Sequence, residues 1–222
     1  MKRLTSILLI LTISIYTSAQ TNYSGTNQIG INNVASSQQE GFYCISIVMQ
    51  VGYENTSKIN QSGFGNYAIN DIIGIYNSVS IEQVGAGQDA EIFIDGDFNG
   101  NENNPVLIDQ QGSYNIAHID LQGTDNFARI RQLGSFNGCL VDLDGNDNSG
   151  NIDMDGVHNY GISIASGNDN FAGVVINGNF NVFATSQLGG NNNMAVIELF
   201  SNFNAAFIFQ NGMNNNIQLV QN

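Results

Sequence analysis

Residues 104–147 read NPVLIDQQGSY, NIAHIDLQGTD, NFARIRQLGSF and NGCLVDLDGND, four consecutive copies of one eleven-residue pattern. The same pattern fills residues 55–98 and 148–214, with one extra residue at Asn192, and a degenerate copy occupies residues 44–54. Its consensus is Asn-x-Ala-x-Ile-x-Gln-x-Gly-x-x, numbered here as positions 1 to 11. Position 9 is glycine in fourteen of the fifteen complete copies, with Ser201 as the exception. Such regularity predicts a repetitive architecture rather than an ordinary globular domain.

Each copy is predicted to form one strand followed by one corner. Positions 1, 3, 5 and 7 alternate with variable positions, which is the pattern of a strand with one buried face. Position 5 is usually isoleucine or valine, and β-branched residues suit a pleated sheet. The segment Gly-x-x-Asn then makes the corner, because glycine adopts positive φ without a steric cost. The predicted corner glycines of residues 55–147 are Gly63, Gly74, Gly85, Gly96, Gly112, Gly123, Gly134 and Gly145.

A single strand cannot bury its apolar side, but two successive copies can do so by folding face to face. The predicted fold is therefore an all-β solenoid, a cross-β stack of about sixteen strand–corner units with two units in each 22-residue coil. Successive coils are expected to stack at about 4.8 Å, the spacing of paired strands.

Alternate copies should then share features, and position 7 of residues 55–147 shows this. One set of copies carries glutamine there, whereas the other carries an apolar residue: Gln61, Gln83, Gln110 and Gln132 against Ile72, Ile94, Leu121 and Leu143. An inward glutamine is costly unless its amide is paired, and a ladder of stacked amides satisfies it. The alternative is that these glutamines lie on the surface. The position-1 asparagines are expected to stack in the same way: Asn66, Asn77, Asn115, Asn126 and Asn137.

The N-terminus has the features of a secretory signal peptide. A basic start, an apolar stretch and a small-residue exit at Ala19 predict cleavage after residue 19. The predicted domains are the signal peptide (1–19), a polar N-terminal segment (20–43) and the repeat domain (44–222). Cleavage would leave three basic residues against nineteen acidic ones, a net charge of −16. This charge excludes nucleic-acid binding through phosphate neutralisation, which needs clusters of Lys and Arg.

The segment Gln-x-Gly-x-x-Asn-x-Ala carries a family resemblance. It begins at Gln61 and again at Gln110, and it recurs from Gln132 with Cys139 in the alanine place. The repeats resemble the curlin repeat of curli subunits over about residues 44–222. They differ from it where Asn stands in the place of Ser and where Leu121 and Leu143 replace the last Gln.

The resemblance implies a non-enzymatic, extracellular amyloid subunit of adhesive fibres (pili or fimbriae) and of biofilm matrix. It also implies self-association into a homopolymer, a nucleator subunit and an outer-membrane export pore as partners, and an export-targeting role for residues 20–43. No cofactor is implied. Nucleators of this family carry a basic terminal repeat. This sequence has none, which favours a major or accessory subunit. The chain also stops within a repeat, which favours end-to-end polymerisation.

Other constellations are interpreted as structural. Asp109, Arg131 and Asp153 are expected to form an outward row of alternating charge, whereas Asp120 and Asp142 would be like-charged neighbours, relieved by Ca²⁺ or simply solvated. His118 and His158 lack metal-site spacing, and Cys139 is expected to be a small core residue. Cys44 is either an accessible thiol that links subunits or a residue without such a role. Aromatic residues that precede the position-1 asparagine are expected to stack along an edge: Tyr76, Phe98, Tyr114, Phe136, Phe180 and Phe203.

Two other functions remain as alternatives. A monomeric surface-binding β-solenoid, of the ice-binding or adhesin-stalk type, would present a regular outward row such as threonine, and the outward positions here are mixed. A β-helical enzyme acting on polysaccharides would cluster catalytic groups in a cleft, and no nucleophile–base pair, phosphate loop or carboxylate pair stands out from the repeat.

Overall fold

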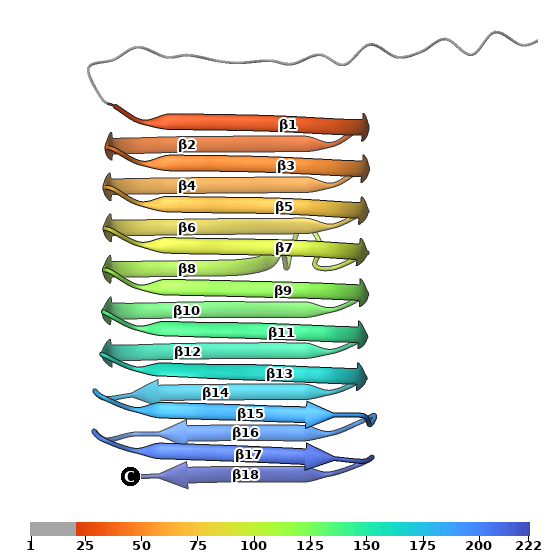
Figure 1. The fold of residues 1–222 in the computed structure, drawn as a ribbon, viewed down its shortest axis with the longest axis vertical. Coiled ribbons are helices and arrows are strands. Elements are labelled where there is room, and N and C mark those ends of the chain that lie inside the picture. Colours follow the sequence, from red (N-terminus) through yellow and green to blue (C-terminus); the bar gives the residue numbers. More distant parts are fainter. Residues whose placement is uncertain (1–20) are drawn as a thin grey trace, which may run out of the picture.

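The computed structural model describes residues 21–222, so the predicted signal peptide lies outside the described residues. This part of the chain forms eighteen β-strands and no helix. The strands wind into a single column, in which successive strands run in opposite directions and every second strand stacks on the one before it (Figure 1). The predicted all-β solenoid with two units in each coil is therefore confirmed, with nine coils.

The strands form two parallel sheets of nine strands each, which we call the odd sheet and the even sheet. Their solvent-facing sides are called the odd face and the even face. The odd sheet contains β1 (Tyr23–Ile31), β3 (Ile45–Tyr53), β5 (Tyr67–Ile75), β7 (Asp89–Asp97), β9 (Ile116–Thr124), β11 (Gly138–Asn146), β13 (Tyr160–Asn168), β15 (Val182–Leu188) and β17 (Ala205–Asn211). The even sheet contains β2 (Val34–Phe42), β4 (Thr56–Phe64), β6 (Ser78–Ala86), β8 (Val106–Ser113), β10 (Phe127–Ser135), β12 (Ser149–Val157), β14 (Phe171–Asn177), β16 (Met194–Leu199) and β18 (Asn216–Gln221).

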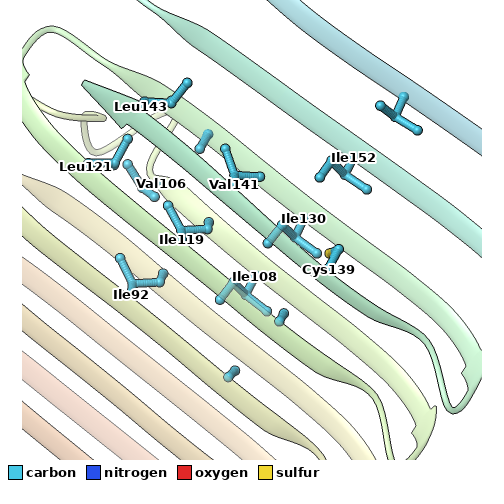
Figure 2. Packing of buried hydrophobic residues seen from close by; sticks show 14 of the residues in the cluster. Ile92, Val106, Ile108, Ile119, Leu121, Ile130, Cys139, Val141, Leu143 and Ile152 are labelled. Atoms are coloured by element: carbon cyan, nitrogen blue, oxygen red, sulfur yellow. The ribbon is translucent and has the colours of Figure 1, made fainter. Parts of the chain in front are cut away.

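The core is a thin layer between the two sheets. Positions 3, 5 and 7 of most strands are buried and the intervening positions are exposed or half-buried, as period-2 alternation requires. Position 5 of the even sheet stacks isoleucine on isoleucine, because Ile59, Ile81 and Ile108 are partners in the strand ladder. Figure 2 shows the isoleucines of both sheets, among them Ile108 and Ile119, meeting between the ribbons. Burial of these side chains, at about 25 cal/mol per Å², drives the coils together.

The corners depend on glycine for two reasons. Gly85 has a φ of 135°, a conformation that other residues rarely adopt. A Cβ atom added there would also lie 1.7 Å from the carbonyl oxygen of Gly112 in the next coil. The close approach of coil on coil therefore excludes a side chain at this position. The last corner residue, such as Tyr76 with a φ of 57°, is left-handed as well.

The solenoid begins earlier than residue 44. The polar segment 20–43 contributes β1 and β2, which pair in register with β3 and β4. This adds two strands to the expected sixteen. The sequence signal is present in retrospect, because Asn33, Gln39 and Gly41 occupy positions 1, 7 and 9 of one more copy.

The insertion near residue 100 falls differently from the expected place. Asn99 is buried and takes position 1 of its coil, since its backbone N donates to Asn77 Oδ1 at 2.9 Å. Asn104, which the pattern predicted to begin that copy, is exposed in a loop that precedes β8. In the same way Gly190, not Gly189, continues the column of corner glycines, because an added Cβ at Gly167 would meet its carbonyl oxygen. Both corrections arise because contacts between coils, rather than residue count, decide which residue occupies a corner.

Candidate functional site

A ladder of glutamine side chains runs through the core of the even sheet. Gln39 Nε2 donates to Gln61 Oε1 at 2.9 Å, and Gln61 donates to Gln83 at 2.8 Å. Gln83 donates to Gln110 at 2.9 Å, and Gln110 donates to Gln132 at 2.8 Å. The structure thus brings together the four predicted glutamines, adds Gln39, and places them inside the column.

Each ladder amide is bonded twice. Besides its rung, Gln83 Nε2 donates to the backbone oxygen of Tyr67 in the odd sheet at 2.9 Å, and Gln110 Nε2 donates to that of Asp89 at 2.9 Å. The ladder therefore ties coil to coil along the column and sheet to sheet across it. A buried amide without partners costs about 1–3 kcal/mol, so this arrangement makes buried glutamine tolerable.

The ladder has a direction, which its interruptions reveal. In every rung the nitrogen donates toward the C-terminal end, so the first glutamine after an apolar residue has an oxygen without a donor. Gln187 follows Ala165, and Gln221 follows Leu199, in their stacks. The Oε1 atoms of Gln187 and Gln221 are indeed buried without a partner. Two shorter ladders, Gln28 to Gln50 at 2.6 Å and Gln187 to Gln210 at 2.9 Å, lie in the odd sheet.

Two asparagine ladders occupy the corners. In the one before the even strands, the backbone N of Asn77 donates to Asn55 Oδ1 at 3.0 Å, and its side-chain nitrogen donates to the carbonyl oxygen of Gly96 at 2.7 Å. The pattern continues through nine residues: Asn33, Asn55, Asn77, Asn99, Asn126, Asn148, Asn170, Asn193 and Asn215. These bonds use backbone groups that the sheets leave free at the corners.

The corner before the odd strands carries an interrupted ladder. It contains the predicted Asn66, Asn115 and Asn137, and Asn137 N donates to Asn115 Oδ1 at 3.1 Å. Gln88 replaces asparagine in one coil, and its Oε1 is buried without a partner. Cys44 replaces it in another coil and is fully buried, so the accessible-link interpretation of this thiol is wrong.

The apolar residues at position 7 stack on apolar residues of the next coil, and the corner glycines stack on glycines. Ile72, Ile94 and Leu121 are ladder partners in the odd sheet, and Leu121 pairs with Leu143. All four are buried. An added Cβ at any of the eight predicted corner glycines would approach the carbonyl oxygen of the corner glycine in the next coil. The eight are Gly63, Gly74, Gly85, Gly96, Gly112, Gly123, Gly134 and Gly145.

Aromatic rings stack along the two corners in separate runs. Tyr76 stacks on Phe98 with ring centroids 5.2 Å apart. The longer run, on the opposite corner, is Tyr114, Phe136, His158, Phe180 and Phe203, with centroids 5.0–5.2 Å apart. His158 is thus a member of a ring stack, which sequence spacing predicted for its neighbours but not for the histidine.

The outward charges form pairs rather than a metal site. Arg131 Nη1 lies 3.1 Å from Asp153 Oδ1, although Asp109 is its other ladder partner. Asp120 and Asp142 are ladder partners of like charge. Burial, with Asp120 and then Asp144 adding to it, raises the pKa of Asp142 above its ordinary value. Across residues 21–222, no three His, Cys, Asp or Glu side chains gather closely enough to hold a metal ion.

The ladder segment also has a counterpart among known families. Residues 100–134, which contain β8, β9 and most of β10, match the family described as the curlin associated repeat. The chain contains a curlin repeat. This repeat points to a curli-type structural subunit, in agreement with the resemblance noted from Gln110 and Asn115. The chain matches no curated protein. No helix in the described part of this curlin-repeat chain is long and apolar enough to cross a membrane.

The two ends of the column that residues 21–222 form present groups of the same ladders. β1 and β2 are the outermost strands at one end, and β17 and β18 at the other. Position 7 is glutamine in all four of these strands: Gln28 and Gln39 at the first end, Gln210 and Gln221 at the second. Position 1 is asparagine in all four units: Asn22 and Asn33, then Asn204 and Asn215. The four end units therefore match one another at the ladder positions, sheet by sheet.

Proposed function

We propose that this curlin-repeat chain is a secreted structural subunit that polymerises end to end into curli-like amyloid fibres at the cell surface. The observation that carries the proposal is the chemical match between the two ends of the column. Exposed strand edges of this kind are templates for the addition of another chain.

The direction of each ladder supports head-to-tail addition. Inside the column the nitrogen of each ladder glutamine donates to the oxygen of the next. Gln210 at the second end would then donate to Gln28 of an incoming copy in the odd sheet, and Gln221 would donate to Gln39 in the even sheet. The same junction would bring the backbone N of an incoming Asn22 to Asn204 Oδ1. Both sheets would continue without a change of register.

Substitution of one glycine, Gly212, can block the stacking of chains without a steric clash inside a single chain. A Cβ atom at Gly190 would lie 1.6 Å from the carbonyl oxygen of Gly212. At Gly212 itself an added Cβ meets nothing closer than 3.8 Å, because no further coil stacks on it within residues 21–222. In a head-to-tail junction the incoming Gly30 would occupy that space.

The experiment compares Gly212→Ala with wild type in the mature chain, residues 20–222, freshly diluted from denaturant. Thioflavin-T fluorescence follows assembly, electron microscopy records the product, and circular dichroism reports the fold of the monomer. We expect wild type to show a lag and a sigmoidal rise, with unbranched fibres that seed fresh monomer. Gly212→Ala should keep the β-rich monomer and lose seeded elongation, because its methyl group blocks the junction.

Alanine at Gly212 also carries the strain of a φ of 104°, so a second variant is needed. Asn204→Ala removes the oxygen that would accept the incoming Asn22. Among the residues that the structure describes, the Asn204 side chain bonds only to Ser201 Oγ, at 3.0 Å. Its matched control is Asn216→Ala, on the exposed face of β18. A soluble β-rich wild-type monomer that stays unassembled for days with added salt would refute the proposal and favour the surface-binding solenoid.

The proposal includes roles in biofilm matrix and adhesion, with a nucleator subunit and an export pore as partners. These follow from the family of the repeat rather than from a contact in the column. Residues 20–43 would serve as the export-targeting segment before folding and as β1 and β2 afterwards. The two roles are compatible because export precedes the pairing of these strands.

A further inference from the structure

We infer that the even face docks onto the odd face of a second copy, so that columns associate side by side as well as end to end. This goes beyond the proposed polymerisation, which uses the strand edges and not the faces. The partner is a second copy in the same orientation and at the same height. Three features of the two faces support it: an unpaired arginine, an acidic band and an apolar hollow with a matching ridge.

The arginine lies on the even face. Arg131 is paired with Asp153, and Lys58 lies 3.7 Å from Glu82. Arg129 on β10 is exposed, and no ion pair involves it within the described residues. It is thus the one cation of residues 21–222 that is free to meet a carboxylate of another molecule.

The acidic band lies on the odd face at the same height. β10 lies between β9 and β11 along the column (Figure 1). The outward side of β7, β9 and β11 carries six carboxylates: Asp89, Glu91, Asp95, Asp120, Asp142 and Asp144. Asp120 and Asp142 are direct neighbours in the ladder, and their mutual repulsion is a cost that a cation would relieve.

Position along the strands also matches. Inside the column, position 3 of an even strand faces position 5 of an odd strand, as shown by the 2.8 Å bond from Asn70 Nδ2 to Ser57 Oγ. A copy displaced perpendicular to the sheets would therefore place its odd position 4 over even position 4. Arg129 holds position 4, and Asp120 and Asp142 hold position 6, about 7 Å farther along the facing strands, which an extended arginine side chain can reach.

The hollow lies beside Arg129 on the even face. It has a volume of about 360 Å³ and is lined mainly by apolar atoms, with Phe171, Val175 and Val196 among its walls. It exists because β14 has Gly173 at outward position 4, where neighbouring strands have side chains.

The odd face offers a ridge that fits this hollow. β13 adjoins β14 in the column (Figure 1). It carries Ile162 and Ile164 at outward positions 4 and 6. Ile162 is 47% exposed, so it presents apolar surface that a second copy can cover. The displacement that brings Arg129 to Asp120 and Asp142 also brings these isoleucines over Gly173. Charge and shape thus select the same arrangement independently, with facing sheets about 10 Å apart.

The test separates the width of fibres from their growth. The mature chain is assembled as wild type, Arg129→Glu, and the double variant Arg129→Glu with Asp142→Arg, whose net charge equals that of wild type. Electron microscopy counts the filaments associated side by side, and seeded thioflavin-T kinetics measure elongation. We expect Arg129→Glu to reduce lateral pairing about tenfold or more at unchanged elongation, because like charges across an interface cost more than 1.4 kcal/mol. The double variant should restore pairing.

Gly173→Val tests the hollow without a change of charge. Its φ is not in the left-handed region, and its added Cβ would contact only side-chain atoms, 3.0 Å from Phe171 and 3.9 Å from Val196. It should lower lateral pairing to the level of Arg129→Glu. The control is Ser36→Val, which adds the same side chain at position 4 of the even face far from the hollow and should behave as wild type.

Pairing of Arg129→Glu and Gly173→Val at the wild-type level would overturn the inference, as would failure of the double variant to restore it. If wild type forms no fibres, the end-to-end proposal fails separately. Docking of the two faces is then measured by sedimentation of the folded monomer at high concentration. Dimers lost in Arg129→Glu and regained in the charge swap would support docking, and identical sedimentation of all variants would refute it.

Discussion

Replacement of Gln110 by leucine in the middle of the glutamine ladder tests whether buried amides hold the column together. Gln110 receives a bond from Gln83 Nε2 at 2.9 Å and donates to Gln132 Oε1 at 2.8 Å. Leucine has nearly the same volume and suits the apolar layer, so packing changes little. What changes is the pairing of the two neighbouring amides.

The magnitude follows from the groups left unpaired. Gln132 Oε1 loses its donor, and Gln83 Nε2 loses one of its two acceptors. Each unsatisfied buried group costs about 1–3 kcal/mol, so we expect the free energy of unfolding to fall by about 2–6 kcal/mol. Gln39→Leu removes the first rung and leaves one group unpaired, Gln61 Oε1, so it should cost about half as much.

The assay is guanidinium unfolding followed by circular dichroism, at a protein concentration below that of assembly. The midpoint and the slope are both compared, since a solenoid can unfold coil by coil. The matched control is Gln111→Leu, the adjacent exposed residue on β8, which should stay within about 0.5 kcal/mol of wild type. Equal effects of Gln110→Leu and Gln111→Leu would refute the ladder as a stabilising element.

Three further predictions concern the corners, the acidic band and the thiols. Gly85→Ala should lower the free energy of unfolding by more than about 3 kcal/mol or abolish folding in the same assay, because its Cβ would meet the carbonyl oxygen of the next coil. Gly65→Ala, whose Cβ would meet nothing within 4 Å, should lower it by about 1 kcal/mol. Because the pKa of Asp142 is raised in the folded state, protonation of this carboxylate stabilises the fold. The free energy of unfolding should therefore rise as pH falls from neutral through the raised pKa to the ordinary carboxyl range. Asp142→Asn should flatten this rise in a pH series of unfolding midpoints. Cys44 and Cys139 are buried, and burial raises the pKa of the Cys139 thiol, so neither should react with a thiol reagent until the chain is denatured; labelling of the native column would contradict the buried placement.

Much of this architecture was predictable because one residue pattern repeats. The period-2 alternation of apolar residues around Ile59 and Ile81 sets the strands, and the glycine at position 9 sets the corners. The alternation of Gln61 with Ile72 predicted two strands in each coil, since ladder partners must lie 22 residues apart. These are local rules, so they can be read wherever the pattern is kept.

The ladder chemistry was predictable in kind but not in detail. Stacked glutamines were expected from Gln61 to Gln132, but the direction of donation and the second bond to the opposite sheet depend on how the two sheets face each other. Sequence spacing also placed Asn104 at a corner that Asn99 occupies. An insertion can fall on either side of a corner, and only the hydrogen bond from Asn99 to Asn77 decides it.

The residue pattern alone is enough to predict the repeat, the buried and exposed positions and the resemblance to curlin repeats, because these depend on residue types at fixed spacing. The folded column was needed to find that residues 23–42 join it, that Cys44 is buried in a corner, and that both ends carry matching rungs. It also brought Arg129 on one sheet to the height of Asp120 and Asp142 on the other. Such relations join residues of separate strands, and they arise only when the coils stack and fix the height of every side chain.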